Sequence, residues 1–209
     1  RGVLYIVGTP IGNLEDISRR GLMTLGKVHL CAAENTKNSK KLLKKYNLST
    51  PLVSYHKYSE GSKLNFLIST LKSGEDVGLI SDAGTPLISD PGYLLVNKAL
   101  EEGIKVIPIP GPSSLIAALS VSGMPLDKFI FYGFPPKKKK ALETFLEKLD
   151  MSDKTSIIFE TKLRIIGFLE ALAEINPNRE IFLAREMTKL YESFYRGSVV
   201  KVIKELSSE

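Results

Sequence analysis

The sequence is poor in the residues that build disulfides and metal centres. Among 209 residues it has one cysteine, two histidines and no tryptophan. Cys31 has no partner for an intrachain disulfide, which is typical of a reducing compartment, so we expect a cytoplasmic protein. With only His29 and His56 beside that cysteine, the chain has too few ligands for a structural zinc site, and we expect no metal.

Long hydrophobic runs are absent as well. No apolar run approaches the roughly 18 to 20 residues that a membrane helix requires, and no basic-then-apolar leader opens the chain. We therefore expect no membrane partner. From Arg1 in place of a methionine we expect N-terminal trimming, and from the last residues, "KELSSE", we expect a truncated C-terminus because no closing strand precedes them.

The composition is that of a globular protein with a mild basic excess. Hydrophobic residues make up 43% and charged residues 25%, close to globular averages. The net charge of +6 permits an anionic partner without requiring one. The excess is local, because two stretches hold several lysines with no acidic residue between them. These lysines are Lys37, Lys40, Lys41, Lys44 and Lys45, and the run from Lys137 to Lys140.

Short apolar runs rich in β-branched residues alternate with amphipathic stretches in the first half. The runs predict buried strands, and Gly103 follows one amphipathic stretch in the position of a helix C-terminal cap. Alternation of this kind favours a parallel α/β sheet. We predict strands at residues 3–7, 28–33, 52–55, 77–80 and 106–109, and helices at 39–46, 63–71 and 94–102.

A segment rich in proline and glycine, "PIPGPSS" at residues 108–114, indicates a crossing between domains. We predict an N-terminal α/β domain at residues 1–110 and a C-terminal α/β domain at residues 111–209. In the second domain the patterns predict helices at 113–122, 138–149, 164–175 and 199–206, and strands at 129–132, 156–159, 181–184 and 193–196.

Three strand ends carry loops of glycine and proline: residues 8–14, 81–86 and 110–114. Ligands of open α/β sheets bind beyond the carboxyl ends of strands, where glycine admits a ligand to the backbone and proline stiffens the loop. A single such loop is more often a simple turn, but three on one edge favour a ligand site. Asp82 in the second loop binds an amine or a ribose hydroxyl, or else caps a turn. Neither G-x-G-x-x-G nor G-x-x-x-x-G-K-[ST] occurs, which disfavours a diphosphate ligand.

Five segments, "YIVGTPIGNLEDI", "AAENTK", "LISDAGTPLISDPGY", "IPIPGPSS" and "AREMTKLYE", together resemble the tetrapyrrole methylase superfamily, and within it the branch that methylates small-subunit ribosomal RNA. The resemblance covers nearly the whole chain. It implies a class III methyltransferase, which has two α/β domains with a cofactor cleft between them, binds S-adenosylmethionine and forms a homodimer. The implied product is a 2′-O-methylated cytidine in the decoding region of 16S ribosomal RNA.

The resemblance also implies which residues hold the cofactor. The "SDAGTP" segment matches the family's methionine-binding loop, and the two serines after the fifth predicted strand match a donor-contacting pair. Three further positions at strand ends complete the implied wall, two of them in the second domain. The implied cofactor-binding residues are Pro10, Asp82, Ala83, Gly84, Thr85, Ser113, Ser114, Phe159 and Ala184.

Methyl transfer from a sulfonium is an in-line displacement, for which a protein mainly supplies alignment and a dry pocket. A ribose hydroxyl is a weak nucleophile and gains from a base or a hydrogen-bond acceptor within reach. Glu186 and Arg185, in a short run at a strand end, are the first catalytic candidates. The other candidates, each with an ordinary ion pair as the alternative, are Glu34, Glu160, Lys162 and Lys189.

The lysine clusters fit an RNA substrate, because phosphate contacts provide most sequence-independent affinity, although a solvated helix face is the common alternative. The predicted RNA-binding residues are Lys37, Lys41, Lys44, Lys45, Lys137, Lys138, Lys139 and Lys140. Tyr55, His56 and Tyr58 are candidates for stacking on bases, with core packing as the alternative. Two rival functions stay open: a methyltransferase of the same fold with a porphyrinoid substrate, and a catalytically silent RNA-binding module.

Overall fold

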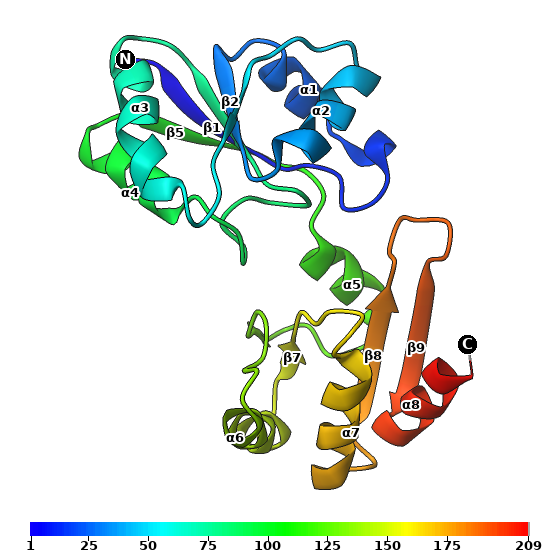
Figure 1. The fold of residues 1–209 in the computed structure, drawn as a ribbon. Helices are drawn as coiled ribbons and strands as arrows, with labels where there is room; N and C mark the ends of the chain where they lie inside the picture. Colours follow the sequence, from blue (N-terminus) through cyan, green and yellow to red (C-terminus); the bar gives the residue numbers. More distant parts are fainter. Residues whose placement is uncertain (209) are drawn as a thin grey trace. The chain divides into compact units, whose positions relative to one another are not determined.

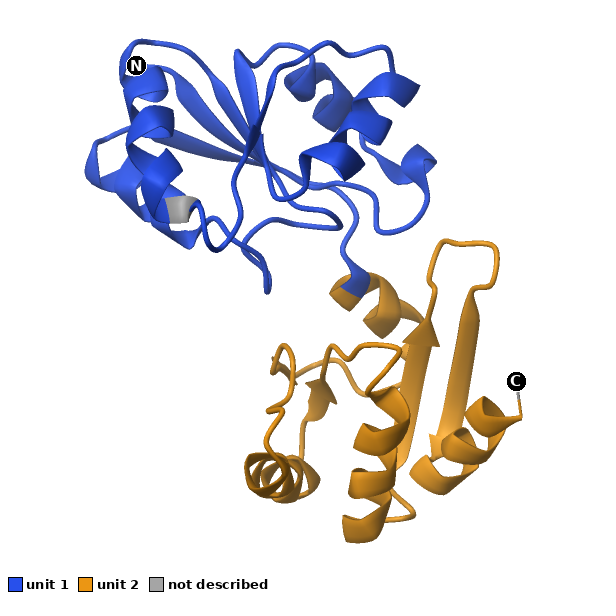
Figure 2. Cartoon of the chain, in the orientation of Figure 1, with its two compact units in different colours: residues 1–114 blue, residues 115–209 orange. Residues whose placement is uncertain are grey.

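The computed structural model describes residues 1–208, apart from the side chain of Glu60, and the chain divides into two compact units (Figures 1 and 2). Unit 1 is Arg1–Ser114 and unit 2 is Leu115–Glu209. The boundary predicted after residue 110 lies a few residues before this division. Each unit has a core of its own, and each is described by itself.

Five parallel strands form the sheet of unit 1, in the order β3-β2-β4-β1-β5. β1 lies between β4 and β5, so Leu4 is paired with Val77 on one side and with Val106 on the other. The predicted parallel α/β sheet is confirmed. Its elements are β1 (Val3–Val7), a 3₁₀ helix (Leu14–Asp16), α1 (Arg19–Leu25), β2 (Leu30–Ala33), α2 (Thr36–Lys45), β3 (Leu52–Ser54), α3 (Glu60–Lys72), β4 (Val77–Ile80), α4 (Tyr93–Glu101) and β5 (Lys105–Ile109).

Helices cover both faces of this sheet, with α3 and α4 on one face and α1 and α2 on the other (Figure 1). The central strands β2 and β4 are wholly buried, which explains why "LCAA" and "VGLI" are apolar throughout. β3 is an edge strand and is only half buried, so the prediction of a buried strand there is wrong. Pro108 lies in β5, the other edge strand. Proline has no N–H to donate, and an edge strand tolerates it because one of its sides has no partner strand.

Side chains at the helix ends account for the boundaries that the hydrophobic pattern missed. Ser18 caps α1, which was not predicted, and Asn35 accepts hydrogen bonds from the N–H groups of Lys37 and Asn38, so α2 begins three residues earlier than predicted. Gly103 follows α4 with a φ of +65°, and the next N–H, of Ile104, donates to the carbonyl of Ala99. These two features form a Schellman motif, which confirms the predicted helix C-terminal cap at this glycine.

Unit 2 combines two small sheets with four helices, three of which pack around one core. β6 and β7 are parallel, whereas β8 and β9 form an antiparallel hairpin in which Ala184 is paired with Phe194. The core includes Leu146, Leu169 and Val199, from α6, α7 and the start of α8. The unit is of α/β type, as predicted. Its elements are α5 (Ser114–Ser122), β6 (Phe129–Phe131), α6 (Lys139–Asp150), β7 (Thr155–Ile157), α7 (Ile165–Ile175), β8 (Glu180–Arg185), β9 (Ser193–Ser198) and α8 (Val199–Ser207).

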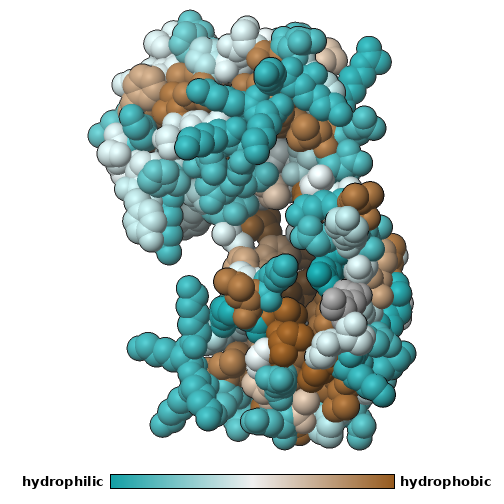
Figure 3. Space-filling view, turned by 45° about the vertical axis from the view of Figure 1, so that its right-hand side comes forward, coloured by the Kyte–Doolittle hydropathy of each residue, from teal (hydrophilic) through white to brown (hydrophobic). Residues whose placement is uncertain are grey.

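The surface is mostly hydrophilic with scattered apolar areas, as Figure 3 shows for one face. The most exposed large apolar side chains are Leu163, Tyr58, Met151 and Leu190. Within the described residues, no helix has the length and apolar character needed to cross a bilayer.

Two neighbouring leucines of α4 test the assignment of the unit 1 core. Leu95 is fully buried, whereas Leu94 is 46% exposed. We expect Leu95→Ala to lower the free energy of unfolding by about 2–5 kcal/mol, because it leaves a cavity between α4 and the sheet. Leu94→Ala on the same helix is the control and should change it by about 0.5 kcal/mol or less. Urea unfolding followed by circular dichroism measures both, and equal losses would contradict the packing described.

Candidate functional site

Three loops of unit 1 meet at one edge of the sheet. Because β4, β1 and β5 are parallel neighbours, their carboxyl ends share that edge, as the sequence predicted. Thr9, just after β1, and Gly84, in the loop after β4, exchange two backbone hydrogen bonds of 2.9 Å. The side-chain oxygen of Thr9, a buried residue, also donates to the carbonyl of Ser81 at 3.1 Å. The first two loops are therefore joined through their backbones.

Glycines let the first and third loops approach more closely than any other residue would. A Cβ atom on Gly8 would lie 2.8 Å from the Cα of Gly111, and one on Gly111 would lie 2.7 Å from the carbonyl oxygen of Gly8. The carbonyl of Pro112 lies 3.6 Å from the Cβ position of Gly84. The glycines that the sequence analysis assigned to ligand contact therefore also allow the loops to pack against one another, because they have no side chain.

The cofactor residues predicted in unit 1 lie on these joined loops. Pro10 and Gly84 are buried, whereas Asp82, Ala83 and Thr85 are exposed. Pro10 and Asp82 both border a small cavity of about 50 Å³, which Asn38 and Ser39 of α2 also line. Ser113 and Ser114 lie at the end of the third loop, where α5 begins, and are half buried.

Three carboxylates gather beside this edge. The backbone N–H of Asp82 donates to Glu34 Oε2 at 3.4 Å, and the side-chain amide of Asn38 donates to Asp82 Oδ2 at 3.1 Å. Asp90, farther along the same loop, has its pKa raised to about 6, first by partial burial and then by the charges of Glu34 and Asp82, while a hydrogen bond from Ser81 opposes the rise. This edge of unit 1 therefore carries a local group of acidic side chains, which attracts cationic groups.

The loop from β4 to α4 also has an unusual backbone. Leu87 and Ser89 have φ angles of +75° and +64°, which non-glycine residues seldom adopt. Strain of this kind concentrates at functional sites, where the surrounding contacts maintain it. Sequence reasoning missed Asp90 and Asn38 as members of the site, although the Asp-Pro-Gly turn that follows Ser89 was a visible signal for Asp90.

In unit 2, the predicted site residues fall on two separate features. Phe159 follows β7 and packs edge-on against Phe131 and Phe134, with ring centroids 4.8 and 5.8 Å away. Ala184 and Arg185 end β8, and Glu186 begins the hairpin loop with a φ of +52°. Glu186 pairs with Lys189 at 3.2 Å, and both side chains are about half exposed. The two catalytic candidates therefore adjoin one another on a β-hairpin.

A buried carboxylate in unit 2 was named by the sequence only as a secondary candidate. The side chain of Glu160 is 3% exposed, and its Oε1 accepts a hydrogen bond from the N–H of Thr161 at 2.8 Å and lies 3.5 Å from Arg164 Nη1. Its Oε2 is buried and has no hydrogen-bond partner within the described residues. Arg164 also donates to the carbonyl of Pro136, so this pair ties together the loops after β6 and β7. Lys162 nearby is exposed.

The predicted RNA-binding lysines lie on two helices. Lys37, Lys41 and Lys44 are exposed on α2, whereas Lys45 forms an ion pair of 3.3 Å with Glu15. The run from Lys137 to Lys140 is exposed at the start of α6, where Lys138 occupies the N-cap without a capping side chain. Because the N-terminus is the positive end of the helix dipole, it favours an anion there.

The stacking prediction fails for one of the three rings. Tyr55 is fully buried in the unit 1 core, so it is wrong as a platform for bases, because its ring packs against neighbouring apolar side chains. Tyr58 is 94% exposed, and its ring lies edge-on to that of His56 with centroids 6.2 Å apart. Across the described residues, no group of three His, Cys, Asp or Glu side chains is arranged to hold a metal ion.

Comparison with known proteins identifies similar chains. Residues 3–202 match the model of the family described as tetrapyrrole (corrin/porphyrin) methylases, which confirms the resemblance predicted from the sequence. Three relatives bear the name "Ribosomal RNA small subunit methyltransferase I". The Thermotoga maritima protein is 46% identical over 97% of this chain and 90% of its own length. The Haemophilus influenzae protein is 46% identical (98% and 72%), and the Bacillus subtilis protein is 45% identical (97% and 69%).

The contact between Gly8 and Gly111 generates a test of the joined loops. We expect Gly111→Ala to lower the melting temperature, because the new Cβ would overlap the backbone of Gly8 and push the β1 and β5 loops apart. Gly61→Ala is the control, since nothing lies within 4 Å of a Cβ there. Differential scanning calorimetry compares the two variants. An unchanged melting temperature for Gly111→Ala would contradict the close approach.

The raised pKa of Asp90 generates a test by pH. A carboxyl whose pKa is higher in the folded state than in the unfolded state binds its proton more tightly when folded, so its contribution to stability falls as the pH rises from about 4 to about 6. We expect Asp90→Asn to be more stable than the parent at about pH 7.5 and to lose this advantage near pH 4. Urea unfolding at the two pH values measures the difference. Asp16→Asn, at an exposed site, should show no such crossover.

Proposed function

The chain belongs to the tetrapyrrole (corrin/porphyrin) methylase family, and on that premise we propose that it transfers a methyl group from S-adenosylmethionine to RNA of the small ribosomal subunit. In finer terms, the proposed acceptor is the ribose 2′-oxygen of a cytidine in the decoding region of 16S ribosomal RNA. The proposal includes a homodimer that works in the cytoplasm.

One observation carries the proposal: the loops after β1, β4 and β5 are joined into a rigid edge beside a cluster of carboxylates. S-adenosylmethionine has an ammonium group and a sulfonium, and both cations favour such an edge. The exposed residues Asp82 and Ala83 suit the amino-acid end of this molecule, Asp82 through its carboxylate. The residues present in unit 1 therefore fit the donor. When bound, the donor supplies an electrophilic methyl group.

The roles of the unit 1 residues follow from their contacts. Asp82 binds the donor ammonium, and the amide of Asn38 orients that carboxylate. Thr9 holds the SDAGTP loop in place through its backbone and its hydroxyl group. Ser113 and Ser114 offer hydroxyl groups from the start of α5. Rigid loops of this kind lower the entropy lost on binding, which leaves more free energy for alignment.

The roles in unit 2 concern the rest of the donor and the acceptor. Phe159 and Ala184 line the donor, and Glu186 accepts the proton of the ribose hydroxyl, while Arg185 binds a neighbouring phosphate. The lysines of α2 and α6 attract the RNA. These exposed basic groups favour an anionic polymer over a porphyrinoid.

Label transfer tests the reaction itself. Incubation with radiolabelled S-adenosylmethionine and small ribosomal subunits from cells without this methylation should label one ribose of the RNA. Nuclease digestion followed by mass spectrometry locates the label. Donor binding without any labelled RNA would reject the proposed acceptor and favour a porphyrinoid substrate, and absence of donor binding would favour the silent RNA-binding module.

Donor binding tests the role of Asp82. At a donor concentration about 100 times the Kd, the parent should gain about 2.7 kcal/mol of stability. We expect Asp82→Asn to raise the Kd about tenfold or more, because it removes a charge-assisted hydrogen bond to the ammonium. Asp16→Asn, an exposed site in the same unit, serves as the control. Isothermal titration calorimetry measures both, and an unchanged Kd for Asp82→Asn would remove this residue from the site.

A further inference from the structure

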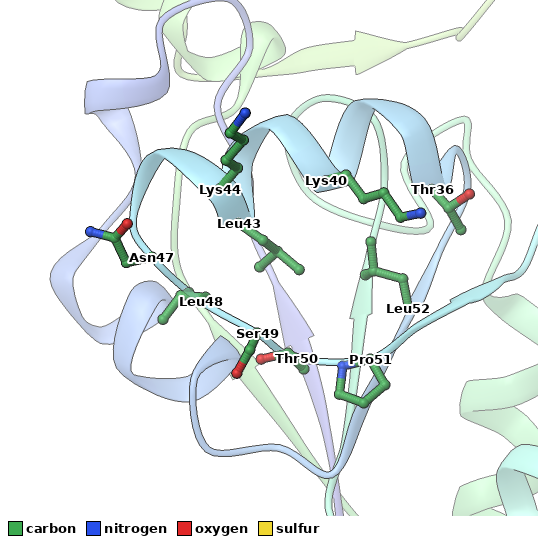
Figure 4. Close-up of a pocket in the computed structure, with 10 residues that line it drawn as sticks. All are labelled: Thr36, Lys40, Leu43, Lys44, Asn47, Leu48, Ser49, Thr50, Pro51 and Leu52. Carbon is green, nitrogen blue, oxygen red and sulfur yellow. The ribbon is translucent and has the colours of Figure 1, made fainter.

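A groove of about 710 Å³ lies in unit 1, along one side of α2 (Figure 4). One wall is α2, which contributes Thr36, Lys40, Leu43 and Lys44 at helical spacing. The other wall is the segment of residues 47–52 that leads into the edge strand β3. In Figure 4, Leu43 points from the helix into the space between the walls, and Lys40 extends along the helix toward Thr36.

The groove has a basic rim and no acidic residue. Lys40 and Lys44 are the only charged residues among those that line it. Both are exposed, and within the described part of the chain neither has an ion-pair partner. Lys45 differs, because it pairs with Glu15. Among the lysines of α2, Lys40 and Lys44 therefore line the groove, whereas Lys37, Lys41 and Lys45 are not among its lining residues.

The remaining lining residues combine apolar and hydroxyl groups. Leu43 is buried, and Leu48 and Leu52 are half buried, so they form an apolar floor. Ser49 and Asn47 are exposed on the wall opposite the helix. The wall is fixed, because the hydroxyl of Thr50 donates to the carbonyl of Leu25 in α1. Single-stranded RNA presents matching groups, namely phosphates for the lysines, 2′-hydroxyls for the polar side chains and base or ribose faces for the leucines.

We propose that this groove binds the sugar–phosphate backbone of single-stranded substrate RNA, with Lys40 and Lys44 contacting phosphates. The inference rests on the proposed function, since it takes RNA as the substrate, and adds to it a binding site and a residue, Lys40, that the sequence analysis had left out of the RNA-binding set. A second copy of the chain fits less well, because a symmetric contact would set the same lysines opposite one another.

Salt-dependent binding tests the two lysines. The full chain is titrated into fluorescently labelled single-stranded RNA at salt concentrations from about 50 to 200 mM. We expect Lys40→Ala/Lys44→Ala to raise the Kd about tenfold at the lower salt, and to make the slope of log K against log salt shallower by about 1.4, which corresponds to two lost phosphate contacts. Lys63→Ala/Lys105→Ala, which removes the same charge from exposed sites of unit 1, should leave the slope unchanged. Equal losses from the two pairs would overturn the site.

Filling the groove tests its shape independently of charge. We expect Ser49→Trp to weaken RNA binding, because the indole occupies the space beside Leu48, whereas Ser69→Trp on the exposed side of α3 should not. Unchanged RNA affinity for Ser49→Trp would overturn the proposal. So would a change confined to oligomeric state, seen by light scattering, or a loss of binding to ribosomal subunits but not to RNA, which would indicate a protein in the groove.

Measurements on the parent protein separate this inference from the proposed function. If the parent methylates subunits and the groove variants methylate them with unchanged KM, the groove proposal fails while the function stands. If the parent neither binds nor methylates RNA, both fail. Donor affinity should stay the same in every groove variant, because none of the changed residues lies on the loops assigned to the donor.

Discussion

The close approach of backbone to backbone at the carboxyl edge of unit 1 is the constraint on which the proposed site depends. Gly8 and Gly111 leave no room for a side chain between their loops, and Thr9 bonds to Gly84 as a strand would. Three loops from three neighbouring strands are thereby fixed at their bases, while Asp82 and Ala83 stay exposed. Rigid support beneath exposed groups is the arrangement that precise alignment of a ligand requires.

Side chains of opposite charge lie on different sides of helix α2. On one side, Asn38 holds Asp82 within a group of carboxylates, and on another Lys40 and Lys44 border a groove with no acidic residue. The proposed donor, a cation, and the proposed acceptor, an anion, are therefore attracted to different surfaces of the same helix. Because the two surfaces carry charges of opposite sign, neither proposed ligand competes electrostatically for the surface of the other.

Much of unit 1 was predictable from the sequence, because its strands are bounded by clear breaks in hydrophobicity. The strands at residues 3–7 and 77–80 were predicted to the residue. The starts of α1 and α2 were harder to predict, since Ser18 and Asn35 act through local capping hydrogen bonds that leave no periodic pattern. Among the site residues, the loops after β1, β4 and β5 were found through their glycines and prolines. Asp90 and the groove beside Lys40 were not, because burial by distant segments and the spacing between walls depend on tertiary structure.

The position of β1 between β4 and β5 has a consequence for folding. Its partners come from much later in the sequence, since Leu4 is paired with Val77 in β4 and with Val106 in β5. β1 joins β4 only once residues 77–80 are present, and β5 only once residues 105–109 are present, so both pairings are long-range contacts that form slowly. The sheet of unit 1 is therefore complete only when both later strands have joined β1, and the apolar residues of β1 have no full core before then.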